Sequence, residues 1–84
     1  MIRIYPTDGP PHDAAAGVRA TLRSVQTLVD GLIEFVPCRD RSVQVWANEE
    51  GLLRGLPYNA TASARFGRHL VGQVVELSGK DLLS

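Results

Sequence analysis

NEEGLLRGLPYNATA, the stretch from Asn48 to Ala62, decides how the second half of this chain folds. Asn48 and Gly51 supply the backbone conformations that a tight turn needs. Residues 52–56 then predict a short strand, and Pro57 ends it because proline has no amide hydrogen to donate within a sheet. The stretch therefore predicts a strand-turn-strand corner.

A short helix is predicted directly after this corner. Asn59 or Thr61 can accept a hydrogen bond from a free amide of the first turn and so cap a helix over residues 60–66. Gly67 breaks this helix, and residues 69–77 predict the last strand.

The N-terminal half predicts one strand and one long helix. Residues 2–5 form a short strand, and the proline-rich segment 7–13 is a loop. Asp13 is the expected N-cap of a helix that starts in the alanines and ends at Gly31 in the left-handed conformation. Helical spacing places one apolar face on this segment, made of Val18, Leu22, Val25, Leu28, Val29 and Leu32.

Two central strands are predicted over residues 32–38 and 42–48, joined by a polar hairpin loop. In the second strand the side chains alternate, and we expect Val43, Val45 and Ala47 to face the long helix. Gln44 and Trp46 then share the opposite face, where an exposed tryptophan favours a protein interface. The alternative is that the terminal segments cover Trp46.

Together these elements predict an α+β fold in a single domain over residues 1–84. Its order is β-α-β-β-β-short α-β, and its sheet is mostly antiparallel with four or five strands. One long helix packs on one face of the sheet, and the other face is expected to be open for partners.

Composition excludes several classes of function. Nine Lys and Arg residues balance nine Asp and Glu residues, so nucleic-acid binding is disfavoured because the chain has no excess of positive charge. No apolar run approaches the roughly 18 residues that span a bilayer, and the N-terminus does not read as a signal peptide. Cys38 is the single cysteine, so no disulfide forms within the chain. We expect a cytoplasmic protein with no membrane contact.

The acidic turn is the first candidate site. Adjacent residues of an extended chain point to opposite sides, so Glu49 and Glu50 are poorly placed to act together as general acid and base. The structural interpretation is that both glutamates are solvated. The functional interpretation is that Asn48, Glu49 and Asn59 supply directed hydrogen bonds to a small polar ligand or to a partner's backbone.

Arg65, Arg68 and His69 form a local basic cluster that is suited to a phosphate or carboxylate. The alternative is an ordinary solvated surface. His12 and His69 lack the close spacing of a metal site, and no nucleotide-binding glycine motif is present, so neither a metal nor a cofactor is predicted.

Three blocks of this sequence resemble an uncharacterised family of short bacteriophage, plasmid and actinobacterial proteins, a domain of unknown function. The blocks are SVQTLVDGLIEFVP (24–37), ANEEGLLRGLPYNATA (47–62) and LVGQVVEL (70–77), and the family's signature is N-E-E-G-x-L-x-G-L-P-x-N. Asp30 stands where the family usually has glycine, and Ala60 where it often has arginine. The second difference removes a charge beside the polar turn. The resemblance implies a phage-type or mobile-element accessory protein, and it implies no activity.

The sequence therefore favours a small non-enzymatic binding module that engages a host protein or a small signalling ligand and forms a homodimer. A different class is a minimal hydrolase or transferase that uses Glu49 or Glu50 with His69. A third is a nucleic-acid-associated accessory protein.

Overall fold

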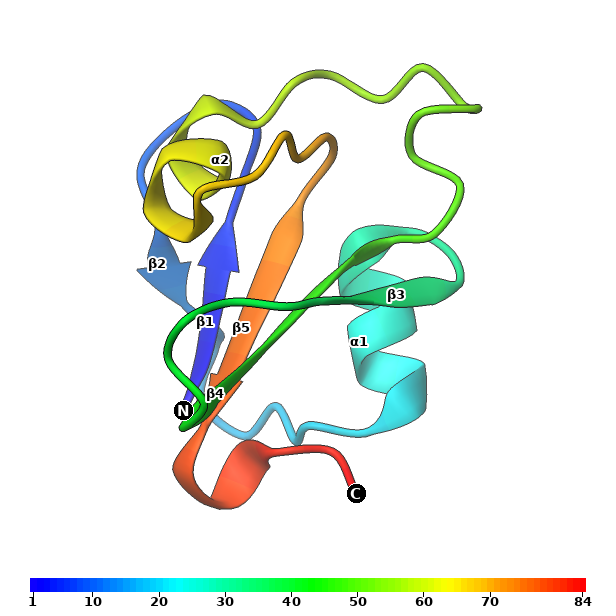
Figure 1. Cartoon of the computed structure of the whole chain (residues 1–84). Coiled ribbons are helices and arrows are strands. Elements are labelled where there is room, and N and C mark those ends of the chain that lie inside the picture. Colours follow the sequence, from blue (N-terminus) through cyan, green and yellow to red (C-terminus); the bar gives the residue numbers. More distant parts are fainter.

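Five strands form one antiparallel sheet in the computed structural model, which describes residues 1–84 (Figure 1). The strands are β1 (Ile2–Tyr5), β2 (His12–Asp13), β3 (Ile33–Val36), β4 (Val43–Asn48) and β5 (Val74–Ser78). Their order across the sheet is β2-β1-β5-β4-β3, and every neighbouring pair is antiparallel. The predicted α+β class is confirmed, with β2 as a strand that the sequence did not predict.

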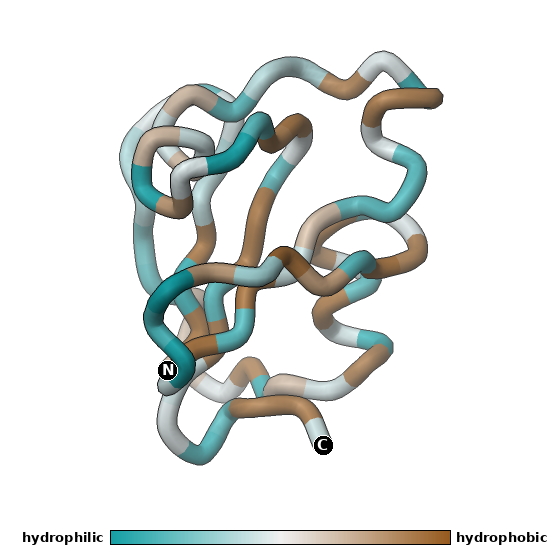
Figure 2. The backbone as a smooth tube through the Cα atoms, in the orientation of Figure 1, coloured by the Kyte–Doolittle hydropathy of each residue, from teal (hydrophilic) through white to brown (hydrophobic).

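Two helices cover opposite faces of this sheet, α1 (Leu22–Val29) and α2 (Ala60–Phe66). Val74 belongs to the apolar cluster beneath α2, whereas Val75 and Leu77 belong to the cluster beneath α1. Adjacent strand residues point to opposite faces, so the central strand β5 supplies both cores. Figure 2 shows hydrophobic positions along this strand in the middle of the molecule. The prediction of an open sheet face was wrong.

The side chains of β4 that were predicted to face the long helix α1 face α2 instead. Val45 and Ala47 are buried in the cluster that includes Ala62 of α2, and Val43 packs against that cluster. Trp46 instead packs against the cluster of α1. Alternation along a strand fixes which side chains share a face, but it does not say which helix covers that face.

The long helix is shorter than predicted at its N-terminal end. It begins at Leu22, where Thr21 and Ser24 form a reciprocal capping box. Asp13 lies in β2 instead, where it pairs with Arg3 of β1. Gly17 has a φ of 88°, which no right-handed helix contains, so the helix cannot extend back to the alanines.

The C-terminal end of α1 also differs by one residue. Asp30, rather than Gly31, takes the left-handed conformation, with a φ of 63°. The Gly31 amide then donates to the Gln26 carbonyl at 2.9 Å, as in a Schellman ending.

No strand forms over residues 52–56, so this prediction was wrong. The segment is a series of turns, and its amides bond locally, from Arg54 to Glu50 at 2.8 Å and from Leu56 to Gly51 at 3.0 Å. Leu53 is 90% exposed, because no neighbouring strand or helix packs against it. The segment projects from the rest of the molecule at the upper right of Figures 1 and 2, with a hydrophobic tip.

The short helix forms over residues 60–66 as predicted, with Asn59 as its N-cap. The last strand begins at Val74 instead of residue 69, because the Gly72 amide bonds to the Pro57 carbonyl at 2.7 Å and holds the preceding residues in a loop. After β5 the chain forms a short 3-10 helix, η1 (Gly79–Asp81), and folds back along the face that carries α1.

Candidate anion-binding groove

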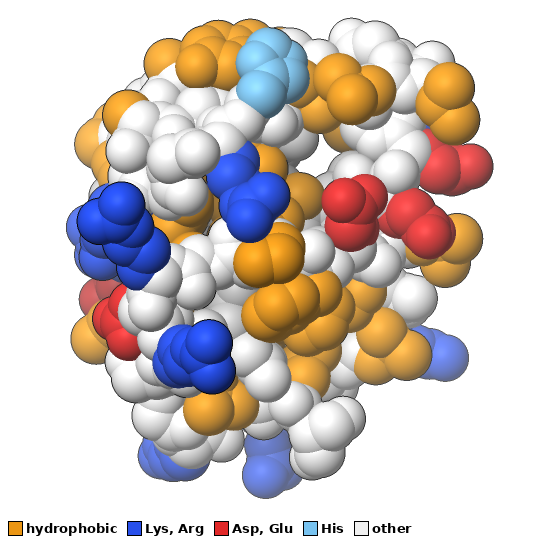
Figure 3. Space-filling model, viewed as in Figure 1, with side chains coloured by type: hydrophobic (Ala, Val, Ile, Leu, Met, Phe, Trp, Pro, Cys, Tyr) orange, Lys and Arg blue, Asp and Glu red, His pale blue; other side chains and the backbone are white.

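A hollow of about 810 Å³ opens between the loop that joins β3 to β4 and the C-terminal end of α2. Three arginines line it: Arg39 from that loop, Arg65 from the last turn of α2, and Arg68 just after α2. Val43 and Phe66 contribute apolar surface to the same hollow. We call it the arginine groove. Figure 3 shows Lys and Arg side chains spread over this face, with hydrophobic and neutral surface between them.

The end of α2 fixes the position of Arg68. Gly67 takes the left-handed conformation with a φ of 69°, which turns the chain sharply out of the helix. The Arg68 side chain then reaches β3, where its Nε donates to the Pro37 carbonyl at 2.7 Å. This bond leaves the two terminal NH₂ groups of the guanidinium free for a ligand.

Arg65 lies over an aromatic surface. Its guanidinium carbon is 5.5 Å from the centre of the Phe66 ring, a cation–π geometry that holds the charge at the wall of the groove. The Phe66 ring packs in turn edge-on against Tyr5, at 5.2 Å between ring centres. The Tyr5 hydroxyl donates to Glu76 at 2.6 Å, and burial together with this bond raises the pKa of Tyr5 above 10.0, whereas Arg65 opposes the rise.

None of the three groove arginines forms an ion pair. The ion pairs of the chain join Arg3 to Asp13, Arg54 to Asp30, and the N-terminal amine to Asp81. Asp40 is the single acidic residue that lines the groove.

The Asp40 carboxylate is engaged within its own loop. It accepts from the Ser42 hydroxyl at 2.6 Å and from the Ser42 amide at 2.9 Å. These two bonds hold the pKa of Asp40 below its usual value of 3.8, and the nearby charge of Arg65 lowers it further. Both bonds end on Oδ1, and Asp40 forms no ion pair with an arginine of the groove.

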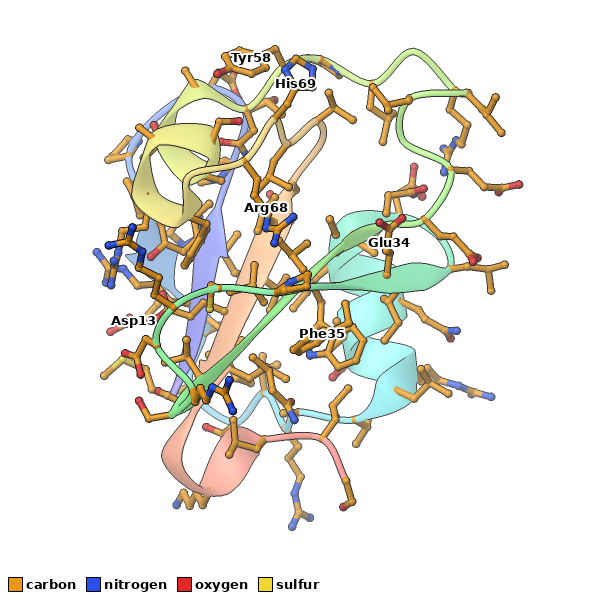
Figure 4. The ribbon with its side chains drawn as sticks, viewed as in Figure 1. Asp13, Glu34, Phe35, Tyr58, Arg68 and His69 are labelled. Atoms are coloured by element: carbon orange, nitrogen blue, oxygen red, sulfur yellow. The ribbon has the colours of Figure 1, made fainter.

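The predicted cluster of Arg65, Arg68 and His69 spans two neighbouring hollows. Arg65 and Arg68 line the arginine groove, and Arg68 also lines a smaller hollow of about 340 Å³ together with His69 and Glu34. The His69 ring lies against Tyr58, with 4.9 Å between ring centres and 33° between planes. Figure 4 shows His69 beside Tyr58, away from Arg68 and Glu34.

Asn48 and Asn59, predicted as recognition residues, are buried and make structural hydrogen bonds. Asn48 donates to the carbonyls of Val29 and Asp30 at 3.0 Å each, so it closes the C-terminal end of α1, and it accepts from the Glu50 amide at 2.8 Å. Both donors and one acceptor site of its amide group are thus occupied within the fold.

Asn59 is completely buried and connects three parts of the chain. Its amide group donates to the carbonyls of Tyr5 and Gly72 at 2.8 Å each, and its oxygen accepts from the Ala62 amide at 2.9 Å. It joins β1, the start of α2 and the loop before β5, so it has no free donor to offer a ligand.

Glu49 and Glu50 are both exposed, and their side chains form no ion pair within the protein. The Glu49 amide bonds to the Leu32 carbonyl at 2.8 Å, which extends the pairing of β3 with β4 by one residue. No hydrogen bond or ion pair connects either glutamate to His69.

Gln44 and Trp46 are partly covered by the C-terminal segment, the alternative considered for Trp46. Gln44 exchanges two hydrogen bonds with the main chain of Leu83, at 2.7 and 2.8 Å. Trp46 packs edge-on against Phe35 at 5.4 Å, and together they line a hollow of about 470 Å³.

Sequence reasoning did not single out Arg39, which lines the groove, or Glu34 and Phe35, which lie on the outer strand β3. The charged loop contains both Arg39 and Arg41, and nothing in the pattern says which of the two faces α2. The signal for Phe35 was its place in a strand that ends at a proline, which is typical of a sheet edge.

No three His, Cys, Asp or Glu side chains come together in a set that could hold a metal ion. None of the helices is both long enough and apolar enough to cross a membrane.

Among curated proteins and solved structures, none matches this chain. A protein-family comparison does give a match, over residues 2–81, and it confirms that the chain belongs to a family of unknown function. The chain belongs to the family described as a domain of unknown function, DUF3846.

Proposed function

We propose that this protein is a non-enzymatic binding module whose arginine groove holds a small molecule carrying phosphate or carboxylate groups. The observation that supports this most strongly is that Arg39 of the β3–β4 loop lines one hollow together with Arg65 and Arg68 at the end of α2. None of them forms an ion pair. A guanidinium presents a planar set of donors that matches the oxygens of phosphate and carboxylate groups.

The dimensions and lining of the groove suit a small ligand. Its volume of about 810 Å³ lies within the range of roughly 300 to 1,000 Å³ that is typical of small-molecule sites. Val43 and Phe66 offer apolar contacts for the uncharged part of such a ligand. A molecule with one anionic end and one apolar or aromatic end therefore fits this lining best.

The biological setting is inferred from the sequence. Its likeness to short phage, plasmid and actinobacterial proteins supports an accessory role in mobile elements, in the cytoplasm of the host. A small signalling ligand agrees with such a role better than nucleic acid does, because the chain as a whole carries no net positive charge.

Calorimetric titration with inorganic pyrophosphate and with citrate tests the proposal and separates phosphate from carboxylate ligands. We expect saturable binding of at least one probe, weakened about tenfold by Arg65→Gln or Arg39→Gln because each removes one charge-assisted contact. Arg41→Gln is the matched control, since Arg41 lies in the same loop but does not line the groove. Absence of binding by both probes, or equal weakening by Arg41→Gln, would refute the proposal.

A further inference from the structure

The two edges of the sheet differ in how open they are. At one edge β2 has two residues, and its Asp13 forms an ion pair with Arg3 across the strands. At the other edge β3 has four residues and no strand beside it. Short and charged edges resist pairing with other chains, so β3 is the edge that can accept another strand.

The main-chain groups at this edge are identified by the hydrogen-bond alternation of antiparallel strands. The Glu49 amide bonds to the Leu32 carbonyl, so Glu34 and Val36 are the β3 residues that bond to β4. The amides and carbonyls of Ile33 and Phe35 therefore point outward. The next outward carbonyl, that of Pro37, accepts from Arg68.

The side chains along β3 are arranged in a self-complementary way. Glu34 is exposed at one end, on the face of the sheet that carries α2, and Arg68 lies at the other end over Pro37 (Figure 4). On the opposite face Phe35 is 49% exposed and packs against Trp46. An acidic end, an apolar centre and a basic end match their own copy when that copy runs antiparallel.

We propose that two copies of this chain join through β3, antiparallel, about a two-fold axis at Phe35. This register pairs the outward main-chain groups of Phe35 with those of the second copy and brings each Glu34 toward the other copy's Arg68. A register centred on Glu34 would place two like charges opposite each other, which is destabilising. A two-fold interface of this kind uses the same patch on both copies.

The resulting dimer has one continuous sheet across both copies, and the aromatic pairs of Phe35 and Trp46 meet on one of its faces. The interface shares Arg68 with the arginine groove, whereas Arg39 and Arg65 lie outside it, so the dimer is tested without added ligand. A monomeric protein that still binds pyrophosphate would overturn the dimer and leave the proposed function intact.

Sedimentation velocity over a range of concentrations tests the dimer with charge-swapped variants. We expect Glu34→Arg and Arg68→Glu each to raise the dimer dissociation constant about tenfold or more, because each places like charges together. The double variant Glu34→Arg/Arg68→Glu restores the opposite charges and should recover most of the affinity. Asp8→Arg, which makes the same change of charge in the loop between β1 and β2, is the matched control and should behave like the natural protein.

Phe35→Pro provides a second test that does not depend on charge. It removes an outward amide while leaving the bonds of Glu34 and Val36 to β4, so it should weaken the dimer more than Phe35→Ala does. A protein that stays monomeric at millimolar concentration would overturn the proposal. A dimer unaffected by Phe35→Pro and by both charge reversals would overturn it equally, since the copies would then meet elsewhere.

Discussion

Two buried asparagines connect the turn of the second half of the chain to the rest of the molecule. Asn59 bonds to the main chain at three places, Tyr5, Gly72 and Ala62, and has no exposed surface. Asn48 donates to the main-chain carbonyls of Val29 and Asp30 at the end of α1. A buried polar main-chain group without a partner is costly, so these side chains stabilise the corner more than its exposed glutamates do.

Asn59→Ala should lower the free energy of unfolding by about 3 kcal/mol, because it leaves three buried main-chain groups without their partner. Glu50→Gln changes an exposed side chain in the same stretch and should alter the free energy of unfolding by less than about 0.5 kcal/mol. Urea denaturation measures both values. Equal stability of the two variants would contradict the structural role of Asn59.

Tyr5 makes the stability of the folded protein depend on pH in the alkaline range. Its pKa is raised above 10.0 by burial and by the bond to Glu76, so the folded state holds the phenolic proton more tightly than the unfolded state does. The stabilisation from Tyr5 is therefore complete below pH 10.0 and is lost as the pH rises through the pKa of the folded state.

Tyr5→Phe should accordingly flatten the decline in stability above pH 10.0, as followed by urea denaturation across the alkaline range. Tyr58→Phe is the control, since Tyr58 is half exposed and makes no hydrogen bond through its hydroxyl. An identical alkaline decline in Tyr5→Phe and the natural protein would contradict this assignment.

At the scale of elements, the junction between α2 and β3 forms the groove. Gly67 ends the helix in the left-handed conformation, and Arg68 then crosses to the Pro37 carbonyl. The hairpin loop supplies Arg39 from the other side. The groove thus depends on the relative position of one helix end and one loop.

Gly67→Ala should lower the free energy of unfolding by about 1 kcal/mol, because a side chain disfavours a φ of 69° although no atom lies within 4 Å of the added carbon. Gly9→Ala carries the same kind of strain, at a φ of 95° with the same open surroundings, and Gly9 does not line the groove. Both variants should lose stability, but only Gly67→Ala should also weaken pyrophosphate binding. Equal binding by the two would contradict the role of this helix end in positioning Arg68.

Structure that depends on local sequence signals was predicted, whereas structure that depends on tertiary contacts was not. Capping and periodicity are local, so the helix at 60–66 and the central strands were predicted from sequence. Residues 52–56 have apolar side chains suited to a strand, but a strand exists only where another strand accepts its hydrogen bonds, and none lies there. The second core beneath α2 was missed for the same reason, because the docking of α2 on β4 and β5 is a tertiary contact.

For the molecule as a whole, net charge conceals the arrangement of charge. Nine basic and nine acidic residues sum to zero, yet Arg39, Arg65 and Arg68 gather at one groove with Asp40 as its single acidic residue and form no ion pair. Sequence placed Arg65 and Arg68 near each other through the turn at Gly67. The position of Arg39 depends on how a hairpin packs against α2, which no local pattern encodes.

The central claim is that this groove binds an anion, and NMR titration of the isotope-labelled protein with pyrophosphate tests it most directly. Saturable shifts should be largest for the main-chain amides of Arg39, Gly67 and Arg68 and for the guanidinium groups that line the groove. Resonances of Arg19, Arg23 and Arg41 should move little, because these arginines lie outside it. Shifts spread evenly over all arginines, or shifts that never saturate, would contradict the account.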